Sequence, residues 1–444
     1  MNPEKKQEML RSAPIPGLVT RLAVPTVISM LVTTFYNLAD SFFVGQLESN
    51  SAQAAVGVVF PLMAIIQALG FFFGHGSGNA ISRHLGAGDM HSAGSLASCG
   101  FFSALGAGLL VMLLGQLFLE PLAMLLGSTE TILPYAKPYL RIILLGAPYM
   151  TASLVLNNQM RFQGNALFSM IGITSGAVLN LVLDPLLIFH FEMGIAGAAW
   201  ATILSQLCSF LLLLGGIKWA KCVPLDIRKL RYLPQLMGEI FKGGLPSLVR
   251  QGLSSLSIVV LNWASRPFGD GAIAAMSVVL RLNNFANSAV IGFGQGFQPV
   301  CGFNYGAGNK ARVREAFWFS VKVASICLVF TAAAGFVFSE ELIGLFREGD
   351  PEVVPIGALA LRLQCLALPL SGWVIMNNML FQTCKITVPA SILAAARQGI
   401  FFLPPLLILP PLLGMLGVQL SLPISEICSF LLALYYNRKL LNKL

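Results

Sequence analysis

The chain has 444 residues, of which 56% are hydrophobic and only 11% are charged, and its mean hydropathy is +0.77. Soluble domains carry roughly 25% charged residues, so this composition excludes an ordinary soluble protein. The net charge of +9 does not point to nucleic acid, because no basic cluster sits on a soluble segment, and we predict no nucleic-acid partner.

Apolar runs long enough to span a bilayer recur along the chain, with short polar segments between them. The first run follows a polar stretch, 1–16, and is long enough to remain in the membrane, unlike a cleaved signal. In chain order, we predict twelve transmembrane helices at 17–44, 54–81, 93–118, 138–160, 166–190, 194–217, 243–265, 273–300, 316–338, 357–380, 387–411 and 414–436. Membrane β-barrels instead show alternating strands of about ten residues. The predicted fold is therefore an all-α polytopic membrane protein.

Basic residues are concentrated in alternate loops, and therefore on one side of the predicted membrane. They lie before or at the start of the first span, follow the even-numbered spans and close the chain, and include Lys5, Lys6, Arg11, Arg21, Arg83, Arg161, Lys218, Lys221, Arg228, Lys229, Arg231, Lys242, Lys310, Arg312, Arg314, Lys385, Arg438, Lys439 and Lys443. The alternate loops 45–53, 191–193 and 411–414 contain no basic residue. Because positive charge stays on the cytoplasmic side, this pattern predicts that both termini are cytoplasmic.

The eight cysteines and four histidines lie singly along the chain. They form no CxxC pair, and their spacing fits neither a disulfide framework nor a zinc site. We interpret both sets as structural or incidental and predict no cofactor.

The two halves of the chain repeat each other at an offset of 220 or 221 residues. The matching stretches include AVGVVFPL (55–62) with AMSVVLRL (275–282), LGAGD (85–89) with YGAGN (305–309), and DPLLIF (184–189) with PPLLIL (404–409). We predict an N-terminal lobe over 1–217, a cytoplasmic linker over 218–242 and a C-terminal lobe over 243–444. Six spans in each half make a parallel repeat, and transporters of this kind hold the substrate between the halves. A duplication without a functional cleft is the alternative.

Charged side chains at bilayer depth cost about 2.5–3.5 kcal/mol on insertion scales, so they face the bundle interior and tend to be functional. The ionisable residues well inside the predicted spans are Asp40, Asp184, Glu426, Arg250, Arg281 and Arg397. Both aspartates belong to the first half. Low dielectric disfavours the double ionisation of two neighbouring carboxylates, and a proton or a sodium ion would relieve their repulsion.

Helical spacing places a polar partner beside each of these aspartates. Asn37 lies three residues before Asp40, and Asn180 lies four residues before Asp184, so each pair shares a helix face. We therefore predict an ion-coupling site. The alternative is that each acid hydrogen-bonds a backbone or hydroxyl group and stays permanently neutral.

The second half lacks counterparts of these acids, because Leu261 and Pro404 occupy the repeat positions. An unpaired buried guanidinium would be costly, so we favour a structural ion pair between Glu426 and one of the three arginines. Substrate contact or gating is the alternative for this group. Two prolines add local breaks: Pro25 can kink the first helix, and Pro185 leaves a carbonyl free to meet an ion.

These features together resemble the multidrug and toxic compound extrusion (MATE) family, and the DinF-like and MepA-like prokaryotic branch fits best. The resemblance rests on Pro25 and Asp40, ISRHLGAGD (81–89), NLVLDPLLIF (180–189) and GIAGAAWATILSQ (194–206), and covers nearly the whole chain. It implies twelve helices in a V-shaped pair of lobes. It also implies an antiporter of the cell inner membrane that exports cationic amphipathic drugs in exchange for protons or sodium, with a role in antibiotic resistance. We expect a monomer.

The resemblance also implies an ion site in the N-terminal lobe. The family's residue types fall on Asp40, Asn180, Asp184 and Thr202, which would be the metal ligands if the coupled ion is sodium. Pro25 matches a proline whose helix is proposed to bend when the aspartate is protonated.

The C-terminal lobe departs from the NorM-like branch of the family, whose members also use acids on helices seven and ten. Here Arg250 stands on helix seven and Asn377 and Asn378 on helix ten, so no acid couples ions there unless Glu426 substitutes. We add Asn37, Asn157, Asn377 and Asn378 as supporting polar residues.

Two other functions are consistent with parts of this pattern. A flippase for a lipid-linked or polysaccharide precursor would need a cationic cavity, which Arg250, Arg281 and Arg397 could line. An intramembrane enzyme would need a catalytic motif, and none is present. The coupled ion is left open, because Asn180 and Thr202 suit a metal ion yet can equally orient a protonated carboxylate.

Overall fold

The computed structural model describes residues 3–46, 50–346 and 352–440, and every element within these ranges is a helix. The elements are α1 (Pro3–Ser12), α2 (Ile15–Gly45), α3 (Asn50–Gly86), α4 (Met90–Leu117), α5 (Leu119–Leu125), α6 (Leu133–Phe162), α7 (Ala166–Pro185), η1 (Leu186–His190), α8 (Gly194–Trp219), η2 (Ile227–Tyr232), α9 (Leu233–Ser265), η3 (Arg266–Phe268), α10 (Asp270–Gly306), α11 (Lys310–Val337), α12 (Ser339–Gly344), α13 (Val353–Thr383), α14 (Thr387–Ala395), η4 (Ala396–Ile400), α15 (Leu403–Leu413) and α16 (Met415–Leu440). The terminal Lys443, used in the charge pattern, and part of the loop 45–53 lie outside the described residues.

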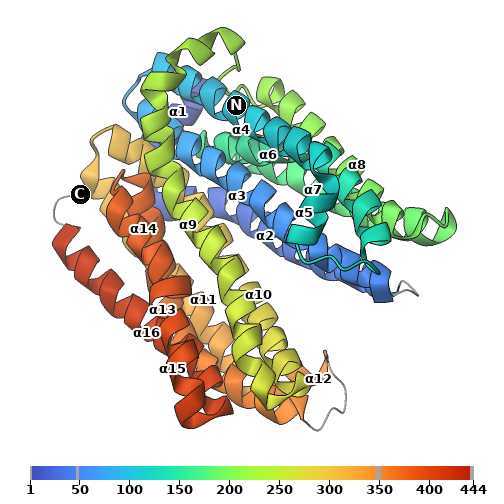
Figure 1. Ribbon diagram of the computed structural model, residues 1–444. Helices are drawn as coiled ribbons and strands as arrows, with labels where there is room; N and C mark the ends of the chain where they lie inside the picture. The colour runs from blue at the N-terminus through green and yellow to red at the C-terminus, as the bar shows by residue number, and fades with distance from the viewer. Residues whose placement is uncertain (1–2, 47–49, 347–351, 441–444) are drawn as a thin grey trace.

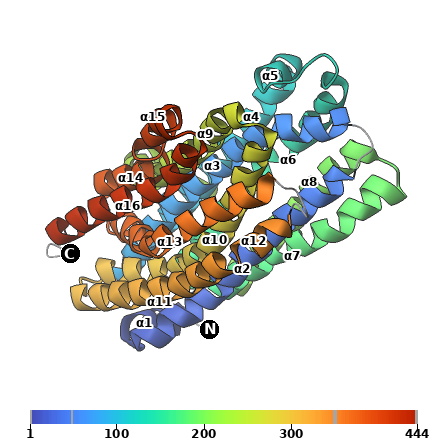
Figure 2. The same cartoon turned by 90° about the horizontal axis from the view of Figure 1, so that it is seen from below.

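Two bundles of helices meet at one end and diverge at the other (Figure 1). The first bundle contains α1–α8 and the second contains α9–α16, and both chain termini lie near the end where the bundles meet. Across this junction, α2 packs against α10 and α3 packs against α9. Figure 2 shows α2 beside α7 on the side of the first bundle that faces the second.

Eleven described helical segments are long and apolar enough to cross a membrane. The remaining predicted span, 273–300, lies within the 37-residue helix α10, which is not among them. The reason is the polar content of α10, which carries Arg281 together with several asparagines and glutamines such as Asn287 and Gln295. The chain is thus an all-helical, multi-pass membrane protein.

The sequence repeat reappears as a repeat of elements. The short helices α5 and α12 begin at Leu119 and Ser339, and the long helices α4 and α11 begin at Met90 and Lys310, at an offset of 220 in both cases. The linker predicted over 218–242 is shorter in the structure, because α8 continues to Trp219 and α9 begins at Leu233.

Small residues allow the helices to approach closely. On α4, the buried positions include Ala93, Gly94 and Ala97, whereas Leu110 and Leu113 are more than half exposed on the opposite side. In a bilayer, exposed leucines contact lipid chains, and small residues bring helix backbones together. The glycines at the junction follow the same rule. A Cβ added to Gly86 would collide with the carbonyl of Phe303, and one added to Gly306 would collide with the carbonyl of Arg83.

Candidate functional site

The N-terminal lobe brings together the four residues expected to bind an ion. Asp40 comes from α2, Asn180 and Asp184 from α7, and Thr202 from α8. The Asn180 amide donates a hydrogen bond to Asp184 Oδ1 at 3.3 Å, and the carboxyl groups of Asp40 and Asp184 interact directly. The Asn180 and Asp184 side chains are fully buried, whereas Asp40 is partly accessible. The two acids therefore form one cluster, in which Asp40 is the more accessible acid.

Local helix geometry fixes the α7 part of this cluster. Asn180 and Asp184 lie one turn apart, so both side chains project from the same face. Pro185 follows immediately and cannot donate a backbone hydrogen bond, and the chain then widens into the π-helical segment η1. The helix is therefore irregular at the point where the carboxylate is held.

Two oxygens of the cluster are unsatisfied. Asn180 Oδ1 and Asp184 Oδ2 are buried and have no hydrogen-bond partner within the described chain. Buried polar atoms are normally paired, because leaving one unpaired costs about 1–3 kcal/mol. Carboxylate, amide and hydroxyl oxygens are the ligands of hard cations, and a carboxylate also accepts a proton. The cluster therefore has the chemistry to take up a small cation.

Tyrosines complete the surroundings of the two acids, and the sequence reasoning missed them. Tyr36 shares a side-chain hydrogen bond with Thr202, which also donates to the carbonyl of Ala198 at 3.0 Å. Tyr139, buried on α6, lies close enough to interact electrostatically with Asp40 and Asp184. The spacing of four residues between Tyr36 and Asp40 was a usable signal, whereas nothing local pointed to Tyr139.

The C-terminal lobe holds an ion pair of Arg397, on η4, with Glu426, on α16. Arg397 donates to Glu426 Oε1 from Nε at 2.8 Å and from its terminal nitrogen at 2.7 Å, and the side chains are 17% and 3% exposed. A cavity of about 230 Å³ adjoins this pair and is also lined by Arg250 of α9. Arg281 reaches neither the pair nor this cavity. It is exposed on α10 and does not line the cavity.

The supporting asparagines have different environments. Asn157 donates to the carbonyl of Ser169 at 3.0 Å, and Asn378 donates to the carbonyl of Ala390 at 2.7 Å, so both fasten a helix to the residue twelve positions later. Asn377 donates to the carbonyl of Trp373 at 2.9 Å. Asn37 is exposed on α2. Asn157 and Asn378 thus each join two helices of one lobe, and Asn377 also accepts a hydrogen bond from Asn437 of α16 at 2.6 Å.

A charged cluster closes the junction between the two bundles. Glu239 of α9 pairs with Arg83 at 2.8 Å, with His84 at 3.3 Å and with Lys385 at 3.4 Å. In the sequence, Arg83 and Lys385 indicated only the cytoplasmic side of the membrane, and no signal pointed to Glu239. Pro25 lies in the same junction: α2 continues through it, and the neighbouring Thr26 donates to the carbonyl of Gly292 at 2.6 Å.

The comparisons with known proteins agree on one family. The MatE family model matches residues 25–186 and 246–406. The multidrug export protein MepA of Staphylococcus aureus (strain MRSA252) is 29% identical over 415 residues, which cover 93% of this chain and 91% of that protein.

Two solved structures are similar along nearly the whole length. The outward-facing conformation of a multidrug resistance MATE family transporter of the MOP superfamily has a TM-score of 0.93 and 26% identity, covering 99% of this chain and 98% of the other. A MOP superfamily transporter from Pyrococcus furiosus, described as having a binding pocket of reverse polarity, has a TM-score of 0.91 and 25% identity at the same coverage. With both halves matched by the family model and the fold shared end to end, this chain belongs to the MatE family of membrane transporters.

Proposed function

We propose that this protein is a secondary active multidrug efflux antiporter of a prokaryotic cytoplasmic membrane. It exports cationic amphipathic compounds in exchange for H⁺ or Na⁺ by alternating access. The observation that carries the proposal is the pair of neighbouring carboxyl groups, Asp40 and Asp184, in a cluster where Asp184 Oδ2 and Asn180 Oδ1 are unsatisfied. Family membership and the similarity to a multidrug export protein support the drug-exporting role.

We infer the direction of each step from the arrangement of the bundles together with the predicted cytoplasmic termini. With both termini in the cytoplasm, the bundles meet on the cytoplasmic side and diverge toward the outside (Figure 1). A proton or sodium ion enters the Asp40 and Asp184 cluster from outside and neutralises it, which favours release of the cationic substrate. After the lobes turn inward, loss of the ion leaves a negative cavity that attracts the next substrate. Coupling requires the ion to bind one conformation better than the other.

Efflux driven by one gradient at a time tests this function. We expect proteoliposomes loaded with rhodamine 123, a cationic dye, to transport it when either a sodium gradient or a pH gradient is imposed, which also identifies the ion. Asp40→Asn should slow gradient-driven efflux at least tenfold, because it removes a charge that the ion neutralises. Asp270→Asn is the matched control, since Asp270 is an exposed aspartate at the start of α10. Undiminished coupled efflux in Asp40→Asn would refute the proposal.

A flippase for a lipid-linked precursor is the second candidate, and the C-terminal cavity with Arg250 and Arg397 favours it. The acid cluster of the N-terminal lobe weighs against it, because two carboxylates repel a pyrophosphate. Movement of a pyrophosphate-linked lipid across proteoliposome membranes, in the absence of dye efflux, would replace the antiporter by the flippase.

A further inference from the structure

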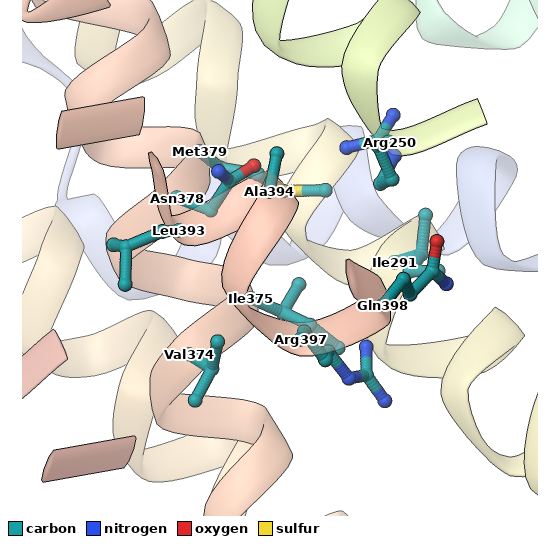
Figure 3. Close-up of a pocket in the computed structure, with 10 residues that line it drawn as sticks. All are labelled: Arg250, Ile291, Val374, Ile375, Asn378, Met379, Leu393, Ala394, Arg397 and Gln398. Atoms are coloured by element: carbon teal, nitrogen blue, oxygen red, sulfur yellow. The ribbon is translucent and has the colours of Figure 1, made fainter. Parts of the chain in front are cut away.

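The cavity of the C-terminal lobe has the opposite polarity to the acid cluster. It is enclosed by α9, α10, η4 and α16, and it carries two arginines and one glutamate. A smaller cavity adjoins it and shares Arg250, Arg397 and Gln398. In Figure 3, these three residues and Ile291 gather on one side of the smaller cavity, with the apolar Leu393 and Val374 on the other. The polar wall of this space is thus formed by Arg250, Arg397 and Gln398.

One positive charge in this space is not neutralised. Arg397 is paired with Glu426, whereas Arg250 forms no hydrogen bond or ion pair with any described residue. Arg397 lies close enough to Arg250 to repel it. A guanidinium held inside a transmembrane helix without a counter-ion is costly, so its retention needs a compensating partner. The cavity beside Arg250 is where such a partner can enter.

The remaining polar atoms of the wall define what the partner contains. Gln398 Oε1 and Glu426 Oε2 are buried and have no hydrogen-bond partner among the described residues, so both are vacant acceptors. The hydroxyl group of Ser254, one turn after Arg250 on α9, also lines the cavity. A guanidinium binds a carboxylate or phosphate through paired hydrogen bonds, and the two acceptors suit an N–H or O–H group next to that anion.

We propose that this cavity binds an oxyanion, a carboxylate or a phosphate, that carries a hydrogen-bond donor nearby. The inference rests on the proposed function in one respect. If the protein is a drug transporter, an oxyanion site extends its substrate class to zwitterionic amphiphiles. The cationic end of such a substrate is attracted by Asp40 and Asp184, and its acidic end by Arg250. The oxyanion has two sources, the substrate itself or the headgroup of an anionic lipid.

A matched pair of dyes isolates the contribution of the oxyanion. Rhodamine 110 carries a free carboxylate, and rhodamine 123 is its methyl ester, so the two differ in this group alone. Binding is measured by fluorescence anisotropy on the full-length protein in phosphatidylcholine nanodiscs without an ion gradient. We expect Arg250→Gln to raise the ratio of the Kd for the acid to the Kd for the ester about tenfold, the effect of losing one charge-assisted hydrogen bond. Arg250→Lys should restore part of this preference, because it retains the charge.

Arg281→Gln is the matched control, because it removes the same charge from an exposed position outside both cavities. Its acid-to-ester ratio should equal that of the wild-type protein. If Arg250→Gln leaves the ratio unchanged, or weakens both dyes equally, Arg250 does not bind an oxyanion and the proposal fails. Continued binding of rhodamine 123 shows that the variant is folded.

A lipid arm separates the two sources of the oxyanion. In phosphatidylglycerol nanodiscs, an anionic headgroup that occupies the site weakens rhodamine 110 binding to the wild-type protein but not to Arg250→Gln. This result supports the oxyanion site and assigns it to lipid, whereas equal binding in both lipids assigns it to the substrate. Neither arm uses an ion gradient, so failure of coupled efflux in the earlier experiment would leave this result standing.

Discussion

The ion pair of Arg397 with Glu426 combines short contacts with almost complete burial of the carboxylate. Moving either charge from water into such a site costs several kcal/mol, and the partner charge repays that cost only while both are present. The pair is therefore a structural element of the C-terminal lobe whose two members depend on each other, and it holds η4 to α16.

Removing one member of the pair should destabilise the protein strongly. We expect Glu426→Gln to lower the free energy of unfolding by about 3–5 kcal/mol, because Arg397 keeps its charge in a buried place without a counter-ion. Replacing both residues by leucine should cost much less, since no buried charge is left behind. Thermal unfolding of the purified protein measures both variants.

An exposed ion pair provides the control for this prediction. Arg362 pairs with Glu340 at 3.0 Å, but their side chains are 40% and 62% exposed. Solvent screens such pairs, so Glu340→Gln should change stability by about 1 kcal/mol or less. Equal effects of Glu426→Gln and Glu340→Gln would contradict the role assigned to the buried pair.

At the scale of helices, the repeat supplies two equivalent N-caps of different chemistry. The Asp89 side chain accepts a hydrogen bond from the Ser92 amide at 2.9 Å at the start of α4. The Asn309 side chain accepts one from the Arg312 amide at 3.4 Å at the start of α11. Hydrogen bonds from Ser92 hold the pKa of the Asp89 carboxyl below its usual value, whereas an asparagine does not titrate.

This difference predicts a pH dependence at one helix and not at the other. Because the folded pKa of Asp89 is depressed, its capping stability is present above the unfolded value of about 3.9 and is lost as the pH falls through the folded value. We expect the protection of the Ser92 amide from hydrogen exchange to fall on acidification relative to that of the Arg312 amide. A constant ratio of the two protections would contradict this prediction.

Alanine at either cap should weaken its helix at neutral pH. Asp89→Ala and Asn309→Ala should each lower the free energy of unfolding by about 1 kcal/mol, the usual contribution of a side-chain N-cap. Thermal unfolding at pH 7 measures both losses. If neither variant changes stability, the caps are not the start signals of α4 and α11.

At the scale of the whole molecule, Glu239 governs the junction between the bundles. Its carboxylate holds Arg83, His84 and Lys385 together, and these come from α3 and from the end of α13. Without the carboxylate, these basic groups repel one another, and the conformation in which the bundles meet here loses stability. A change in the relative stability of two conformations shifts their populations.

Glu239→Gln should therefore shift the protein toward a conformation in which the bundles separate at this junction, which is inward-open in the proposed orientation. Spin labels at Leu125 and Leu345, exposed positions near the ends of α5 and α12, report the separation of the bundles at the opposite end. In a cysteine-free background, we expect the shorter distances between these labels to become more populated. Glu120→Gln is the control, because Glu120 pairs with Lys137 within one bundle. An unchanged distance distribution would show that Glu239 does not hold the junction.

Local signals predicted the helices well and the contacts between lobes poorly. A long apolar run can be recognised from local composition alone, and most of the predicted spans match described helices. In the Asp40 cluster, helical spacing on α7 paired Asn180 with Asp184. The resemblance to the family indicated the full set of four residues. Tyr139 and Glu239 were not recognisable, because their roles depend on residues of other helices that lie far away in the sequence. Arg281 and Arg250 both lie well inside predicted spans, so the sequence did not distinguish them. The structure does, because Arg250 lines a cavity and Arg281 is exposed.

The glycines at the junction have a consequence for the origin of the fold. Gly86 and Gly306 are 220 residues apart, and each lies against the backbone carbonyl of the residue three positions before its counterpart in the other half. Each half therefore contributes both a glycine and the carbonyl that the other glycine contacts. Such a contact is isologous, as in a two-fold symmetric homodimer. A single half of this chain carries both components. The junction thus preserves the geometry by which an unduplicated ancestor could pair with a second copy of itself.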